Sequence, residues 1–172
     1  GKVDTVIING AECEPYITSD DRLMRETPER VVGGLRVVLQ ILQPKRAAIG
    51  IEQNKPEAIA AISAVLGSGI DLLPLHVRYP QGAEKQLIQT VTGRCVPPGG
   101  LPAHVGCAVF NAATCAAIYD AVYLGLPLVR RAVTVTGSAI AKPGNFLAPI
   151  GTAYSDLVEA AGGFALPPYK IL

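Results

Sequence analysis

Four short apolar runs, each followed by a polar loop and a helical segment, constrain the fold of this chain more than any other feature. The runs predict strands, and the periodic segments between them predict helices of ordinary length. Strands that alternate with helices at this spacing form βαβ units and a mostly parallel sheet, so we expect an α/β domain. The predicted strands are Lys2–Asn9, Arg46–Ile51, Leu72–Tyr79 and Val105–Phe110, and the predicted helices are 28–43, Lys55–Leu66, Glu84–Thr92 and Thr114–Leu124. We expect Thr27, Asn54 and Thr114 to cap the first, second and fourth of these helices, and Gly33-Gly34 to weaken the first.

The pattern changes after Pro127. Two extended segments, Ala132–Thr136 and Asn145–Ile150, precede a short helix over Ser155–Ala161, which Gly162-Gly163 closes. This unit is too small to stand without support from other parts of the protein. The sequence therefore predicts two domains, 1–127 and 128–172.

Composition excludes several classes of function. Fifteen basic and fourteen acidic residues leave a net charge of +1, and aromatic residues are 5% of the chain, so no nucleic-acid interface is expected. No apolar run approaches the roughly 20 residues of a membrane span, and the start of the chain is unlike a signal peptide. The four cysteines show no CxxC spacing and His76 and His104 lack ligand-spaced partners, so we expect reduced, mostly buried thiols and no metal site.

The polar residues that could bind a ligand follow the predicted strands. Ligands of parallel sheets bind beyond the carboxyl ends of the strands, which here are the loops Asn9–Asp21, Glu52–Asn54, Tyr79–Glu84 and Asn111–Thr114. The first loop carries Glu12 and Glu14 beside an amide and a phenol, and carboxylates accept hydrogen bonds from hydroxyls, ring N–H groups and exocyclic amines. A nucleotide or a flavin suits such a loop. The alternative is an acidic turn whose carboxylates are simply solvated.

The third loop leads into a predicted helix. Backbone N–H groups at a helix start are able to hold a phosphate or a ring carbonyl, although Glu84 and Glu14 repel a phosphate that comes close. No GxGxxG or GxxxxGK[ST] fingerprint accompanies the loop, which leaves an ordinary βα turn as the alternative.

Several long motifs resemble those of the RnfC family, a component of the Rnf electron transport complex. The motifs are IINGAECEPYITSDDRLMRE, IGIEQNKPEAI, YPQGAEKQLIQTVTG and VTVTGSAIAKPGNFLAPIGTAYSDLVEAAGG. The predicted domain 1–127 is also similar to the NADH-binding flavoprotein subunit of complex I, and the predicted domain 128–172 resembles a soluble-ligand-binding β-grasp (SLBB) module. The resemblance therefore implies a Rossmann-like FMN- and NADH-binding domain over 1–127 and an SLBB module over 128–172.

The resemblance also implies cofactor-binding residues. Those expected to line the flavin or the nicotinamide nucleotide are Asn9, Glu12, Cys13, Glu14, Tyr79, Gly82, Glu84 and Asn111. Ala11 and Ala83 stand where the complex I relatives have acids, which alters the hydrogen bonds available to the nucleotide. A Gly-rich loop is expected upstream of Gly1 and cysteine-rich ferredoxin motifs downstream of Leu172, so the 4Fe-4S clusters are expected outside this chain, which alone should be inactive.

The implied activity is that of a peripheral subunit on the cytoplasmic side of the bacterial inner membrane. It accepts electrons from NADH on FMN and passes them to iron–sulfur clusters, in a complex that couples NADH and ferredoxin to ion movement. The expected partners are the other Rnf subunits and, distally, ferredoxin. Two alternatives stay open: the flavin-dependent cobalamin reductase of a microcompartment, and a non-catalytic docking or ligand-binding module.

Overall fold

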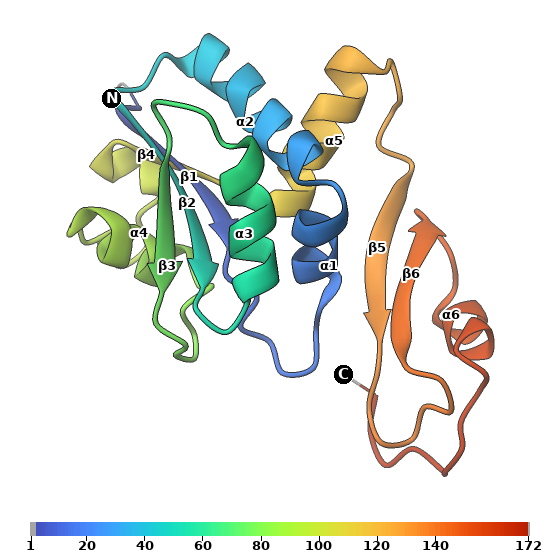
Figure 1. Ribbon diagram of the computed structural model, residues 1–172. Coiled ribbons are helices and arrows are strands. Elements are labelled where there is room, and N and C mark those ends of the chain that lie inside the picture. The colour runs from blue at the N-terminus through green and yellow to red at the C-terminus, as the bar shows by residue number, and fades with distance from the viewer. Residues whose placement is uncertain (1–2, 172) are drawn as a thin grey trace. The chain divides into compact units, whose positions relative to one another are not determined.

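The computed structural model describes residues 3–171, which form two compact units (Figure 1). The first unit comprises the chain up to Glu14 together with Asp20–Pro127, and the second comprises Pro15–Ser19 together with the chain from Leu128 onward. Lys2, the first residue of a predicted strand, lies outside the described residues.

A four-stranded parallel sheet forms the centre of the first unit, with the strand order β3-β2-β1-β4 (Figure 1). This arrangement confirms the predicted α/β fold. The strands are β1 (Thr5–Gly10), β2 (Arg46–Glu52), β3 (Asp71–Leu75) and β4 (Cys107–Asn111). The helices are α1 (Ser19–Glu26), α2 (Pro28–Leu42), α3 (Pro56–Val65), α4 (Glu84–Thr92) and α5 (Ala112–Tyr123), with a 3₁₀ turn over Pro102–Val105.

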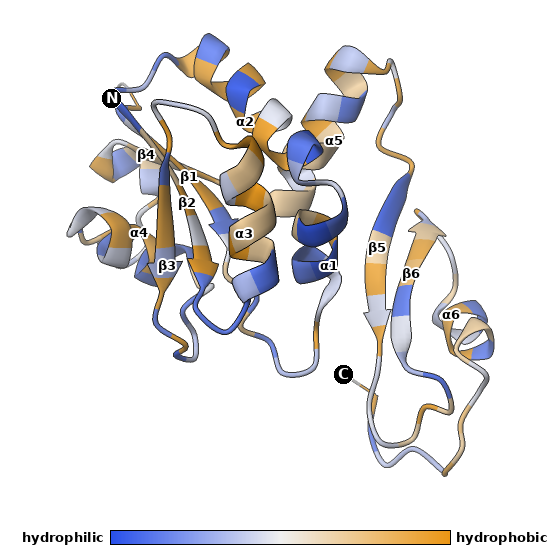
Figure 2. Ribbon diagram, in the orientation of Figure 1, coloured by the Kyte–Doolittle hydropathy of each residue, from blue (hydrophilic) through white to orange (hydrophobic). Residues whose placement is uncertain are grey.

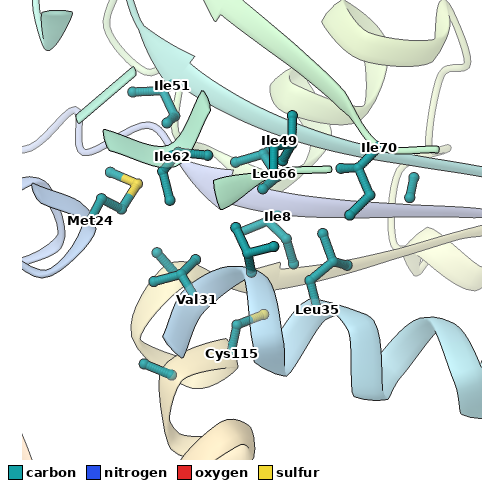
Figure 3. Packing of buried hydrophobic residues seen from close by; sticks show 14 of the residues in the cluster. Ile8, Met24, Val31, Leu35, Ile49, Ile51, Ile62, Leu66, Ile70 and Cys115 are labelled. Atoms are coloured by element: carbon teal, nitrogen blue, oxygen red, sulfur yellow. The ribbon is translucent and has the colours of Figure 1, made fainter. Parts of the chain in front are cut away.

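Both faces of the sheet bury apolar side chains, because each strand alternates its side chains between two helical layers. On one face, Ile8 and Ile49 of the sheet pack in the same cluster as Val31 and Leu35 of α2 (Figure 3). On the other face, Ile7 and Ala48 pack with Leu87 and Ile88 of α4. The strands are accordingly apolar over most of their length, whereas the loops at their ends are polar (Figure 2).

The glycine pair in α2 has a packing function that the helix propensities do not reveal. A Cβ atom on Gly34 would lie 1.8 Å from the Cys115 carbonyl oxygen of α5, and one on Gly33 would lie 2.4 Å from the Tyr119 ring. Arg30 of α2 also donates to both carboxylate oxygens of Asp120, with Nε 2.8 Å from Oδ1. The helix is therefore intact over Pro28–Leu42, and the two glycines let α5 pack against its backbone.

Several predicted boundaries are wrong for local reasons. The third strand ends at Leu75 rather than Tyr79, and it is an edge strand, where Pro74 is tolerated. The fourth begins at Cys107 rather than Val105, because Gly106 has a left-handed φ of 73°. The predicted cap Asn54 is not used: α3 follows Lys55, which makes no side-chain capping bond.

The second unit contains a two-stranded antiparallel sheet of β5 (Arg130–Val135) and β6 (Gly144–Pro149), followed by α6 (Tyr154–Ala160). These bounds lie within two residues of the predicted ones. Gly162 and Gly163 follow the helix with φ near 80°, and an isolated bridge joins Ile140 to Phe164. Thr18 belongs to this unit as well: its Oγ1 accepts a hydrogen bond from Asn145 Nδ2 at 3.0 Å, and its backbone N–H donates to Thr134 Oγ1 at 3.2 Å.

Candidate functional site: the carboxyl edge of the parallel sheet

The candidate site lies at the carboxyl edge of the sheet, where β1 and β4 are neighbours. From β1 the chain builds the sheet outward through β2 and β3 on one side and places β4 on the other, so the strand order reverses beside β1. Ligands of open α/β sheets bind in the crevice at such a reversal. Asn9 and Asn111 are register partners there, at the ends of the two adjacent strands.

Asn9 connects β1 to the turn that precedes α4. Its side-chain amide donates to the Gly82 carbonyl oxygen at 2.8 Å, and its Oδ1 accepts from the Ala11 N–H at 3.1 Å. Gly82 has no room for a side chain, because a Cβ atom there would lie 2.3 Å from the Ala11 carbonyl oxygen and 3.1 Å from Cys13 Sγ. The structure thus brings three of the predicted site residues, Asn9, Cys13 and Gly82, into one place.

Glu12 stabilises the start of α1, a helix that sequence reasoning missed. It is 8% exposed, and its two carboxylate oxygens accept hydrogen bonds from the Asp20 and Asp21 N–H groups at 2.9 and 3.4 Å. These are two of the backbone donors that a helix start leaves unsatisfied. A negative charge at this end also suits the helix dipole. Because Glu12 lies eight and nine positions before the two donor residues, no local capping signal precedes the helix.

Asn111, rather than the predicted Thr114, caps α5. Its Oδ1 accepts from the Ala113 N–H at 2.8 Å, and its amide nitrogen donates to Asp20 Oδ2 at 2.5 Å. The helix starts at Ala112, so Thr114 lies inside its first turn. Asn111 thereby ties β4, α5 and α1 together at the carboxyl edge.

The remaining predicted residues surround this edge with their side chains open to solvent. Glu14 and Glu84 are exposed, and Tyr79, which precedes a cis peptide bond to Pro80, is 78% exposed. Glu84 is the first residue of α4, whose N-cap position, Ala83, supplies no side-chain hydrogen bond. These side chains are free to turn toward a ligand at the edge.

Glu52 begins one of the predicted ligand-side loops, but the sequence analysis did not name it as a cofactor-binding residue. It ends β2 and is 3% exposed, and burial raises the pKa of its carboxyl group above the ordinary value. Lys55 lowers this pKa, and the negative charges of Glu12 and Glu14 raise it further. The available signal was a glutamate that directly follows the apolar run 47–51 of the strand RAAIGIE.

These groups fit the ring and the hydroxyl-bearing chain of a flavin. Amides and carboxylates pair with hydroxyls, ring N–H groups and carbonyls, and Gly82 leaves the backbone of the turn open to close approach. The acids do not suit a phosphate, and Lys85 at the start of α4 donates instead to the Pro97 carbonyl oxygen at 3.2 Å. Across residues 3–171, no three His, Cys, Asp or Glu side chains are grouped so as to hold a metal ion.

All four cysteines are free thiols, and two of them, Cys107 and Cys115, are buried. Cys13 is half-buried and Cys95 is exposed, so the expectation of mostly buried thiols holds for only half of them. Burial raises the pKa of Cys115 to about 12, which keeps this thiol protonated.

Curated relatives with high sequence identity are subunits of ion-translocating oxidoreductase complexes. The C subunit of the proton-translocating ferredoxin:NAD(+) oxidoreductase complex of Clostridium ljungdahlii is 50% identical, over 99% of this chain and 38% of the relative. The C subunit of the ion-translocating oxidoreductase complex of Pseudomonas aeruginosa is 46% identical (99% and 24%). That of the Na(+)-translocating ferredoxin:NAD(+) oxidoreductase complex of Acetobacterium woodii is 44% identical (99% and 39%). The chain thus spans well under half the length of these relatives.

Solved structures share the fold. An NAD+-reducing [NiFe]-hydrogenase in its H2-reduced state superposes with a TM-score of 0.73 at 24% identity, over 91% of this chain and 32% of the hydrogenase chain. At this identity the likeness establishes the fold alone. Within the described chain, every helix is too short or too polar to cross a membrane.

Two family models account for most of the sequence. Residues 1–120 match the Nuo51 FMN-binding domain, and residues 132–171 match the SLBB domain. The resemblance to the RnfC family is confirmed by the relatives above, since all three are C subunits and align over nearly the whole chain. The chain belongs to the Nuo51 FMN-binding domain family and carries an SLBB domain behind it.

Proposed function

We propose that this chain is the central part of an RnfC-type subunit in which residues 1–127 bind FMN and NADH and residues 128–172 form the SLBB module. The observation that carries the proposal is the register pairing of Asn9 with Asn111 at the strand reversal, surrounded by Glu12, Cys13 and Gly82. The family membership supports FMN as the ligand, and the names of the relatives support NAD as the redox partner.

The residues of the edge divide into two groups with different tasks. Asn9, Glu12, Asn111 and Gly82 are held by backbone contacts and shape the floor of the site. Glu14, Tyr79 and Glu84 are exposed and are available to the second ligand, the nicotinamide nucleotide. Bound FMN supplies the redox chemistry by accepting a hydride from NADH, and the protein positions the two rings. No acid of the site needs to transfer a proton.

In the full-length protein, we propose that the electrons continue to 4Fe-4S clusters outside this chain. The subunit then works at the cytoplasmic face of the membrane with the other Rnf subunits, and ferredoxin is the distal electron partner. The relatives' names, which combine ferredoxin, NAD and ion translocation, support the ferredoxin partner and the ion-translocating complex.

The decisive experiment mixes the full-length, FMN-loaded protein with NADH under anaerobic conditions and follows the flavin absorbance. Bleaching of the oxidised flavin band establishes the NADH–flavin step. A flavin that stays oxidised contradicts NADH as the electron donor. The protein would then bind ligands without catalysing NADH oxidation. Reoxidation of the reduced flavin only by a corrinoid would instead identify a cobalamin reductase.

Two substitutions test the site itself. Glu12→Gln and Glu84→Gln remove one negative charge each with little change in shape, and both should weaken binding of FMN or NADH. The exposed acid Asp71, at the opposite edge of the sheet, supplies the control Asp71→Asn. Unchanged affinity for both ligands in Glu12→Gln and Glu84→Gln contradicts the site and favours a non-catalytic module.

A further inference from the structure

Glu52 is a buried carboxyl group without a partner among residues 3–171. It is 3% exposed, yet its side chain makes no hydrogen bond within these residues, and none of their lysine or arginine nitrogens lies within 4 Å of it. Every side-chain nitrogen or oxygen of the described chain that is fully shielded from solvent does have a hydrogen-bond partner. The carboxyl oxygens of Glu52 therefore keep a narrow contact with solvent, although the rest of the residue is enclosed.

The alternation of β2 places this carboxyl on the α4 side of the sheet. Ala48 belongs to the apolar cluster under α4, and a Cβ atom on Gly50 would contact Leu75 and Leu87 of the same cluster. Residues two apart in a strand share a face, so Glu52 follows Ala48 and Gly50 on that side. Asn9, two residues after Ile7 of the same cluster, reaches Gly82 there.

The carboxyl also faces the loop that follows β1. In the parallel register Gly10 pairs with Ile51, so Glu52 ends β2 beside the start of that loop. The charges of Glu12 and Glu14 act on the Glu52 carboxyl, as does Lys55 from the turn after β2. On its other side, Glu52 pairs in register with the apolar Leu75 of β3. Its solvent contact thus opens at the same edge as Asn9, Glu12 and Gly82.

We propose that Glu52 is a further ligand-binding residue, whose carboxyl group hydrogen-bonds a hydroxyl or N–H group of the nucleotide bound at this edge. The inference rests on the proposed function and deepens it. The neighbouring acids exclude a phosphate or another anion as the group that meets Glu52, because like charges repel. A hydroxyl or N–H donor satisfies the carboxyl and removes the cost of an unpaired buried acid.

A purely structural role would leave the burial of this acid unexplained. A buried acid without a partner costs desolvation free energy, so replacing it with an uncharged side chain of similar size should be neutral or stabilising. Glu52→Met keeps the length of the side chain and removes its hydrogen bonds, and Glu52→Gln keeps a carbonyl acceptor. Both variants should therefore unfold at the same temperature as the wild type or higher.

The test measures FMN affinity by quenching of flavin fluorescence in the full-length protein, together with the KM for NADH and the unfolding temperature. Glu52→Met should weaken the binding of FMN or of NADH about 10- to 100-fold, the effect expected when a hydrogen bond to a carboxylate is lost. Glu52→Gln should restore affinity to within about fivefold of the wild type, and Asp71→Asn should match the wild type. A change confined to FMN places the donor on the flavin, whereas a change confined to NADH places it on the nicotinamide nucleotide.

Two results overturn the inference alone. Glu52→Met that binds FMN and NADH as the wild type does shows that no ligand group meets Glu52. Affinity that falls together with the unfolding temperature in both variants assigns Glu52 to the fold instead. A wild-type protein that binds no FMN overturns the proposed function and the inference together.

Discussion

The two edges of the parallel sheet differ in whether their acidic side chains have basic partners. At the amino edge, Asp4 accepts a hydrogen bond from Arg94 at 2.7 Å, and Asp71 accepts one from Arg46 at 3.0 Å. At the carboxyl edge, Glu14, Glu52 and Glu84 form no ion pair with any base of residues 3–171.

The pKa values express the same contrast. The Arg94 guanidinium and the Thr5 hydroxyl hold the pKa of Asp4 below its ordinary value, whereas burial raises the pKa of Glu52. The fold thus supplies partners for Asp4 and Asp71 at the amino edge, whereas Glu14, Glu52 and Glu84 at the carboxyl edge have no ion-pair partner among residues 3–171. A carboxyl group that the fold leaves without a partner is tolerated where a ligand can supply one, so the difference between the edges supports the site proposed at the carboxyl edge.

The largest loss of stability is expected from a substitution inside the sheet, because the sheet interior supports both edges. Ile49 is fully buried, and Ile49→Ala should lower the free energy of unfolding by about 2–5 kcal/mol. Ile41, which is 73% exposed on α2, supplies the matched control, and Ile41→Ala should change stability by no more than about 0.5 kcal/mol. Denaturant titration of both variants measures the difference. Similar losses would show that the sheet is not the common support of the two edges.

Two glycines provide a matched pair, one at each edge. Gly82→Ala places a Cβ atom against the Ala11 carbonyl oxygen, which should displace the turn before α4 and weaken FMN binding about 10- to 100-fold. Gly106→Ala, at a left-handed φ beside Asp4 and Arg94, should cost about 1–2 kcal/mol of stability and leave FMN affinity unchanged. Fluorescence titration and thermal unfolding separate the two effects. Loss of FMN affinity in Gly106→Ala would contradict the prediction that only the carboxyl edge takes part in FMN binding.

The pH dependence of stability should have opposite signs at the two edges. The pKa of Asp4 is lowered from 3.8, so its stabilising contribution is present above that value and is lost as the pH falls through the folded-state pKa. The pKa of Glu52 is raised from 4.5, so its contribution is present below that value and is lost as the pH rises through the folded-state pKa. Asp4→Asn should therefore destabilise, and Glu52→Gln stabilise, the protein at neutral pH, with both differences vanishing in acid. Unfolding curves from pH 3 to pH 8, about the range over which carboxyl groups titrate, check this, and equal signs at neutral pH would refute it.

The smallest effect is expected in the alkylation rates of the four cysteines, which mass spectrometry measures. The exposed Cys95 should react first, and Cys107 and Cys115 only on unfolding, because both are buried. Burial also raises the pKa of Cys115 to about 12. Cys13, half-buried at the carboxyl edge, should react more slowly when FMN is bound, whereas the rate at Cys95 should not change. Cys13 that reacts at the same rate with and without FMN would place the flavin elsewhere.

The strands, and the edge of the sheet at which their polar loops gather, were predictable from the sequence, because apolar runs and polar loops follow directly from burial. The helix Glu84–Thr92 was predicted to the residue, since its start and its closing Gly93 are local signals. α1 was missed because its capping group, Glu12, comes from a different loop position and reaches the helix only in the folded chain.

Side-chain roles within the site were less predictable. Asn111 and Thr114 are both reasonable caps for α5, and only the register of β4 selects Asn111. Glu52 resembles any other polar residue at the end of a strand, and its burial depends on β1, β3 and α4 packing around it. Long-range packing decides both cases, and no local pattern encodes it.

The assignment of Pro15–Ser19 to the second compact unit has a consequence for how such proteins recombine. Thr18 shares hydrogen bonds with Thr134 and Asn145, although more than a hundred residues separate them in the chain. A genetic crossover near residue 128 would exchange the SLBB segment and leave Thr18 behind with a foreign partner. Chimeras of this chain with a relative should therefore take Thr18 and Asn145 from the same parent, because the residues that form these hydrogen bonds lie on both sides of the crossover.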